Sequence, residues 1–97
     1  MMTRDRIIRI LTEHRAELEE LGVRSLSLFG SAARGETTSS SDVDLLVEFS
    51  VPVGLFRFLD VKAYLENLLG GEVDLVTPDA LKRQLRDSIL SEAVHAL

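Results

Sequence analysis

Asp42 and Asp44, two aspartates one residue apart, are the side chains of this sequence best suited to chemistry. They begin a segment, residues 42–49, whose apolar alternation predicts a β-strand, and residues two apart on a strand point their side chains to the same side. Two carboxylates this close repel each other unless a cation lies between them, and hard oxygen ligands of this kind suit Mg²⁺. The pair alone is weak evidence, because a strand cap and a solvent-facing carboxylate would give the same pattern.

A third carboxylate, Asp74, strengthens the prediction of a site. It interrupts the short apolar segment 73–76, in which Val73 and Leu75 face the opposite way. If this segment is a strand beside residues 42–49, Asp74 joins the face that carries Asp42 and Asp44. Polar residues at matching places in two apolar strands are costly for folding, so a functional role is the better explanation.

Gly30 and Ser31 follow a predicted strand over residues 23–29 and have the properties of an anion site. Glycine permits close approach of the backbone, the following residues can open a helix whose N–H groups favour an anion, and the serine hydroxyl can donate to a phosphate oxygen. Arg34 could reach the same phosphate, or it could pair with Glu36 on a solvated helix face. The motif is neither a Walker A loop nor a dinucleotide-binding loop, and a tight turn with a helix cap remains an alternative.

The elements that must position these residues alternate between helix and strand. Apolar periodicity and turn residues predict helices over residues 3–21 and 55–69, strands over 23–29, 42–49 and 73–76, and a helical region from Thr77 to about Val94. Thr3 is the expected N-cap of the first helix. The fold class is therefore α/β (α+β), with a small mixed central sheet flanked by helices.

Three further side chains allow expectations of their own. His14 falls on the apolar stripe of the first helix and is expected to be a packed histidine rather than a ligand. His95 is expected to be exposed near a fraying end of the chain. Phe56 projects away from the core stripe of helix 55–69, alongside Ala63; local packing under the preceding loop is expected, with a partner contact as the alternative.

Length and composition exclude several classes of protein. Ninety-seven residues are expected to form a single domain, residues 1–97. Eleven basic and 16 acidic residues leave a net charge of −5, which argues against nucleic-acid binding through phosphate neutralisation. The lack of cysteine excludes a disulfide scaffold, a thiolate zinc site and a cysteine nucleophile. No apolar run approaches the roughly 18 residues of a membrane span, and the N-terminus is not a secretory signal, so a cytoplasmic protein is expected.

The string GSAARGE followed by SDVDLLVEF, with the later Asp74, resembles the minimal nucleotidyltransferase (MNT) subgroup of the polymerase-β-type nucleotidyltransferase superfamily. The resemblance runs from about Leu26 to Asp74. It implies the nucleotidyltransferase fold and transfer of a nucleoside monophosphate from a triphosphate to a hydroxyl, with release of pyrophosphate. It also implies two Mg²⁺ ions, with ATP as the expected substrate.

The roles that the resemblance implies follow its motifs. Asp42 and Asp44 would hold the triphosphate-bound metal, and Asp74 would complete the second metal and help to deprotonate or orient the acceptor hydroxyl. The glycine–serine pair, Gly30 and Ser31, would grip the β- and γ-phosphates. Arg34 would assist them.

The acceptor is expected to lie on another protein, because a chain this short has little left to wall a second pocket. The MNT subgroup resembles antitoxins paired with HEPN-domain RNase toxins, some of which are neutralised by adenylylation of a tyrosine hydroxyl. The leading hypothesis is therefore an antitoxin that transfers AMP to a HEPN toxin. Two alternatives remain: an antitoxin that acts by contact alone, and a nucleotidyltransferase for a small-molecule hydroxyl such as an aminoglycoside. A homo-oligomer is compatible with each.

Overall fold

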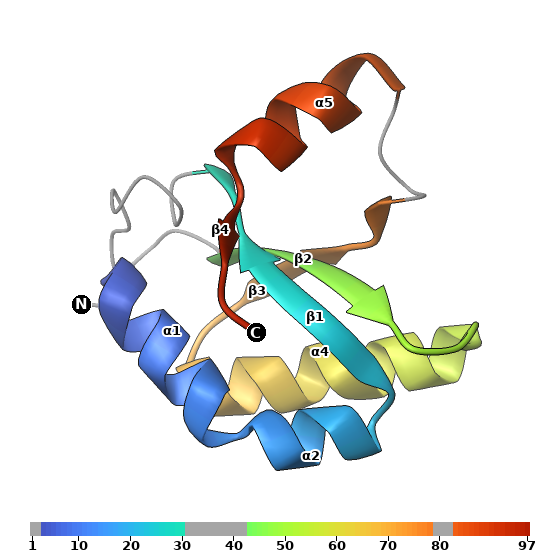
Figure 1. Cartoon of the computed structure of the whole chain (residues 1–97). Helices are drawn as coiled ribbons and strands as arrows, with labels where there is room; N and C mark the ends of the chain where they lie inside the picture. Colours follow the sequence, from blue (N-terminus) through green and yellow to red (C-terminus); the bar gives the residue numbers. More distant parts are fainter. Residues whose placement is uncertain (1–2, 31–42, 79–82) are drawn as a thin grey trace.

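A four-stranded mixed sheet forms the centre of the protein in the computed structural model, which describes residues 3–30, 43–78 and 83–97 (Figure 1). The strand order is β3-β2-β1-β4, with bounds Val73–Val76, Val43–Phe49, Val23–Leu28 and Val94–His95. β2 and β3 are parallel, whereas β1 is antiparallel to both of its neighbours. Because parallel strands need a crossover, the long helix α4, Leu55–Leu69, connects β2 to β3. The mixed sheet and the α/β class agree with the sequence prediction.

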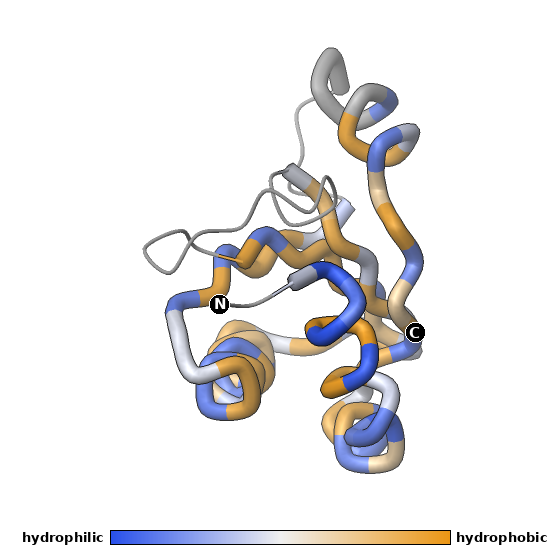
Figure 2. Tube along the Cα trace, turned by 90° about the vertical axis from the view of Figure 1, so that its left-hand side faces the viewer, coloured by the Kyte–Doolittle hydropathy of each residue, from blue (hydrophilic) through white to orange (hydrophobic). Residues whose placement is uncertain are grey.

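The core lies between one face of this sheet and a layer of three helices. These helices are α1 (Arg4–Glu13), α2 (Arg15–Glu20) and α4, and Figure 2 shows them beneath the sheet. Each helix contributes fully buried apolar side chains, and every second residue of β2 meets them from the sheet. The side chains that are completely buried include Ile7, Leu11, Leu18, Leu26, Leu28, Leu45, Val47, Val61 and Leu65. The last helix, α5 (Arg83–Glu92), stands apart from this layer at the top of both views.

The predicted single helix over residues 3–21 is wrong, because the chain breaks at His14 into α1 and α2. The imidazole Nδ1 of His14 donates to the carbonyl oxygen of Ile10 at 2.8 Å, and that carbonyl is the one a continuous helix would offer to the His14 amide. The backbone amide of His14 instead donates to the carbonyl oxygen of Leu11 at 3.1 Å. His14 is half-buried and satisfied within its own helix, as expected of a packed histidine.

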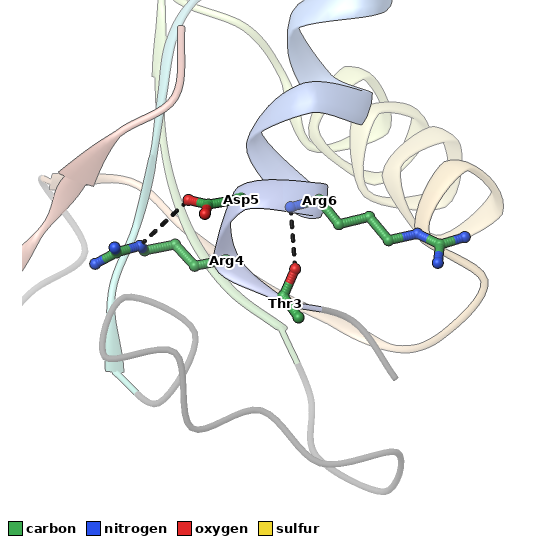
Figure 3. Close-up of polar contacts among 4 residues, drawn as sticks. All are labelled: Thr3, Arg4, Asp5 and Arg6. Carbon is green, nitrogen blue, oxygen red and sulfur yellow. Dashed lines mark hydrogen bonds and ion pairs between the residues drawn. The ribbon is translucent and has the colours of Figure 1, made fainter.

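Thr3 caps α1 as predicted: its side-chain oxygen accepts a hydrogen bond from the backbone amide of Arg6 at 3.2 Å (Figure 3). Beside it, Arg4 and Asp5 form an exposed ion pair. A threonine cap satisfies one of the donors that every helix N-terminus leaves unpaired. The N-terminus of α1 is therefore determined by the local sequence.

The N-terminal end of β1 departs from simple alternation. A register shift between Val23 and Ser25 moves Val23 to the core side together with Leu26 and Leu28. Strict alternation from Val23 would have placed it on the face opposite to these two leucines. The bulge adds one residue to β1, so the residues before it point to the opposite face from the one that regular alternation would give them.

The C-terminal segment also differs from its prediction. The helical region ends at Glu92, and residues 94–95 form β4 on the free edge of β1, where His95 is the register partner of Ser27. The Ala96 amide then donates to the Leu26 carbonyl at 2.8 Å. The expected fraying end is therefore wrong, although the His95 side chain is exposed as expected. Pairing at this edge satisfies backbone groups of β1 that would otherwise lack partners.

The helices in the described parts of the chain are all too short or too polar to cross a bilayer.

The packing predicts that Leu65→Ala lowers the free energy of unfolding by about 2–5 kcal/mol, because it leaves a cavity beneath the sheet. Leu90→Ala removes the same atoms from an exposed site on α5 and is expected to cost less than about 1 kcal/mol. Urea unfolding monitored by circular dichroism measures both variants. Equal losses in the two would contradict the assignment of the core.

Candidate functional site

Asp44 and Asp74 lie side by side on the face of the sheet opposite to the helices α1, α2 and α4. They are register partners in the parallel pair of β2 and β3, and neighbouring strands are about 4.8 Å apart. On either side of each aspartate, the flanking apolar residues point into the core. Asp44 is half-buried and Asp74 is exposed. The expectation that strand 73–76 neighbours strand 42–49 is confirmed.

Gly30 lies directly against the carboxyl group of Asp44. The amide of Phe29, at the end of β1, donates to the Asp44 carbonyl at 3.1 Å and draws this turn to the start of β2. Gly30 has a φ of +62°, and a β-carbon placed there would come within 3.3 Å of Asp44 Cγ and overlap its Oδ2. Only glycine fits both the backbone angle and the space. The two halves of the sequence motif therefore meet at one edge of the sheet.

The remaining candidate residues, Ser31, Arg34 and Asp42, lie outside the described residues. In the sequence, Ser31 directly follows Gly30 and Asp42 directly precedes Val43. Their roles remain predictions.

The donor set at this edge is suited to a hard cation. Carboxylates from two adjacent strands, Asp44 and Asp74, supply the oxygen ligands that Mg²⁺ prefers, and the face is open to solvent at Asp74. Within residues 3–30, 43–78 and 83–97, no three His, Cys, Asp or Glu side chains gather in a cluster that could hold a metal. The predicted third ligand, Asp42, belongs to the part of the chain that is not described. The described carboxylates thus fit Mg²⁺ without completing its site.

The sequence did not predict that His95 would share this face. Because Ser27 pairs with Leu46 on β2 and with His95 on β4, the imidazole is on the same side of the sheet as Asp44, two strands away. Nothing in the apolar periodicity marks β4, which exists only through its pairing with β1. A strand of two residues is too short to show the alternation of apolar and polar residues by which strands are predicted.

A cavity lies at the other end of β2. Its volume is about 710 Å³, and its walls include Val51, Pro52, Leu55 and Phe58 with the ion pair of Arg24 and Glu48 near them. From Asp44 to Phe49 the strand extends for about 17 Å at 3.3–3.4 Å per residue. This cavity is therefore separate from the carboxylate edge.

Tyr64, the only tyrosine of the chain, lies on α4, where it packs half-buried against the core. Burial raises the pKa of its phenol, and the carboxylate of Glu17 on α2 adds to that shift. Both effects favour the neutral hydroxyl. Tyr64 is on the helical side of the sheet, away from Asp44, and is a structural residue.

Comparison with known proteins agrees with this arrangement. The family model of the nucleotidyltransferase domain matches residues 11–95. Protein adenylyltransferase MntA of Thermococcus cleftensis is 45% identical over 96 residues, which cover 98% of this chain and 97% of that protein. The solved structure of a "putative minimal nucleotidyltransferase" superposes with a TM-score of 0.83 at 34% identity, covering 96% of this chain and 95% of the other.

A more distant likeness shows the fold alone. It is to a chain of the solved complex between a tri-AMPylated HEPN toxin of Shewanella oneidensis and an MNT antitoxin. The TM-score is 0.59 at 19% identity, with 97% of this chain and 68% of the other covered. The family model and the near full-length relative are sufficient for assignment: this chain belongs to the nucleotidyltransferase domain family, as a minimal nucleotidyltransferase.

Proposed function

We propose that this protein is a protein adenylyltransferase that acts as an antitoxin, transferring AMP from ATP to a hydroxyl, most simply a tyrosine hydroxyl, of a partner HEPN toxin. The observation that carries the proposal is the placement of Asp44 beside Asp74 with Gly30 against the Asp44 carboxyl. The adenylyltransferase relative supports the reaction, since its match extends over nearly the whole of both chains. We expect the reaction to take place in the cytoplasm, where ATP is available.

The reaction exchanges one phosphate ester bond for another. The acceptor oxygen attacks the α-phosphorus of ATP and forms a new P–O bond, while the bond to the β-phosphate oxygen breaks and pyrophosphate leaves. Two Mg²⁺ ions, when bound, would neutralise the charge on the attacking and leaving oxygens. Asp42 and Asp44 would hold the ion on the triphosphate, and Asp74 would share in holding the second.

The chain's own residues then have distinct tasks. The exposed carboxylate of Asp74 is accessible to an incoming acceptor and can orient its hydroxyl and accept its proton. The bare backbone at Gly30 leaves room for the phosphates beside Asp44, where a side chain would block them. The Ser31 hydroxyl would donate to a phosphate oxygen, and Arg34 would add positive charge. Catalysis here is mainly positioning and charge neutralisation.

Asp44→Asn is expected to lower AMP transfer by about 10²-fold or more, because it removes the negative charge that holds the metal. Asp42→Asn should have the same effect. The measurement is intact-mass analysis of the co-expressed toxin partner after incubation with ATP and Mg²⁺, scored as added AMP. Glu19→Gln, which neutralises an exposed carboxylate on α2, is the matched control and should keep full activity. Normal modification of the toxin by both aspartate variants would refute the catalytic assignment. A toxin that the antitoxin inhibits without adding AMP would favour an antitoxin acting by contact.

Asp74→Asn is expected to reduce turnover more than nucleotide binding, since Asp74 serves the acceptor side of the reaction. Calorimetric titration with ATP and Mg²⁺ gives the affinity, and single-turnover transfer to the toxin gives the rate. The rate should fall by at least about tenfold more than the affinity. Parallel losses of the two would place Asp74 on the triphosphate instead.

Gly30→Ala is expected to impair both stability and transfer, because the added methyl group meets the Asp44 carboxyl and the positive φ is strained for alanine. A loss of stability of about 1 kcal/mol or more should appear in urea unfolding. Gly71→Ala provides the control, since a β-carbon there has no neighbour within 4 Å and its φ is not positive. Normal transfer by Gly30→Ala would show that the close approach to Asp44 is not needed.

A further inference from the structure

Helix α4 turns different side chains to the core, to solvent and to the edge of the sheet. Val61 and Leu65 are fully buried, whereas Phe56 is 83% exposed, so the expectation that Phe56 packs under the preceding loop is wrong. A partner contact at Phe56 stays a prediction. Glu66 directly follows Leu65 and lies about 100° further around the helix, where it is half-buried. A carboxylate that is partly removed from water needs a hydrogen-bond donor, and the sheet supplies one.

Glu66 binds the start of β3. Its Oε2 atom accepts a hydrogen bond from the backbone amide of Val73 at 3.1 Å, and its carbonyl oxygen accepts one from the amide of Gly70 at 2.9 Å. This one residue therefore binds both ends of the turn that connects α4 to β3. Gly70 has a φ of +72°, and a β-carbon built at Gly70 or Gly71 would have no described atom within 4 Å. The turn is thus held by hydrogen bonds rather than by side-chain packing at its glycines.

The amide of Val73 points away from the rest of the sheet. β3 is the outermost strand of the described sheet, and the carbonyl oxygen of Glu72 accepts from the amide of Val43 on β2 at 3.1 Å. Because the C=O and N–H groups of a trans peptide point in opposite directions, the Val73 N–H points to the outer edge of β3. β2 cannot pair with it there, and Glu66 is its partner instead.

The residue after Val73 is Asp74, so this hydrogen bond lies next to the candidate site. The side chain of Val73 is 2% exposed in the core, and Asp74 points to the opposite face. Asp74 is exposed, so packing of its own side chain does little to hold it, and its position follows that of the β3 backbone. A displacement of about 1 Å at a reacting group can lower a rate about 10²-fold. The support of the β3 backbone therefore matters for the reaction.

We propose that Glu66 is a positioning residue for Asp74: its bond to the Val73 amide fixes the start of β3, so that Asp74 remains beside Asp44. The inference rests on the proposed function, in which Asp74 orients the acceptor hydroxyl. Glu66 belongs to the helix that covers the other face of the sheet, so it acts through the backbone of β3 and not on the substrates.

Two substitutions separate the hydrogen bond from the charge. Glu66→Ala removes the acceptor, whereas Glu66→Gln keeps an acceptor oxygen without the negative charge. In Glu66→Ala, single-turnover transfer of AMP to the toxin is expected to fall by at least about tenfold, while the affinity for ATP stays within about twofold of wild type. Glu66→Gln should transfer within about twofold of the wild-type rate. Glu66→Asp keeps the charge on a side chain that is one methylene too short, and should resemble Glu66→Ala.

Val23→Ala is the control for a general loss of stability. It removes buried atoms where Val23 pairs with Phe49, at the end of β2 remote from Asp44. Transfer by this variant should equal that of the wild type at temperatures where circular dichroism shows both to be folded. A slower rate in Glu66→Ala alone then reports on the site and not on the fold.

A double-mutant cycle with Asp74→Asn shows whether Glu66 acts through Asp74. Adding Glu66→Ala to Asp74→Asn should lower the rate by less than about twofold, because the group that Glu66 positions is already disabled. Deuterium exchange followed by NMR gives a readout that needs no activity. The Val73 amide should exchange at least about tenfold faster in Glu66→Ala than in wild type, and Glu66→Gln should protect it.

Four results would overturn the role of Glu66 in a protein that transfers AMP. They are a wild-type rate in Glu66→Ala, equal slowing by Glu66→Ala with and without Asp74→Asn, failure of Glu66→Gln to keep the rate, and unchanged exchange at Val73. A wild-type protein that adds no AMP to the toxin would instead refute the proposed function, and the role of Glu66 with it. The wild-type rate therefore distinguishes a failed enzyme from a failed positioning residue.

Discussion

The parallel register of β2 and β3 is the constraint on which the candidate site depends. It sets Asp44 opposite Asp74, so that two carboxylates meet although 29 residues separate them in sequence, from 45 to 73. The register is maintained from the other face, where the apolar neighbours of each aspartate pack against α4. Because strand side chains alternate, burying Val43, Leu45, Val73 and Leu75 forces both carboxylates to the opposite side. The same apolar packing that stabilises the fold therefore creates the site.

A second constraint is the close approach of Gly30 to Asp44. The turn after β1 can come this near to the Asp44 carboxyl only without a side chain. The antiparallel pairing of β1 with β2 delivers the turn to the right edge, with the amide of Phe29 bonded to the Asp44 carbonyl. Opposite chain directions in adjacent strands thus bring the end of one to the start of the other.

The two surfaces of the molecule have opposite requirements. Under the proposed function the carboxylate face must remain open to a nucleotide and an acceptor, whereas the outer side of α4 exposes apolar groups that are more stable when covered. A single core of this size, with one layer of helices under one sheet, has two sides: the sheet face that carries Asp44 and Asp74, and the outer side of the helices.

Strong local signals in the sequence determined much of this protein. Apolar alternation identified β2 and β3, continuous periodicity with a terminal glycine identified α4 as Leu55–Leu69, and Thr3 identified the start of α1. The acidic pattern and the glycine predicted a phosphate chemistry that the family assignment supports. Only the tertiary structure decided the break at His14, the bulge after Val23 and the strand β4, because each depends on a bond to a particular partner rather than on a repeat. The same is true of Phe56: periodicity gives the direction of a side chain on its helix, but whether anything covers that direction depends on how the rest of the chain packs.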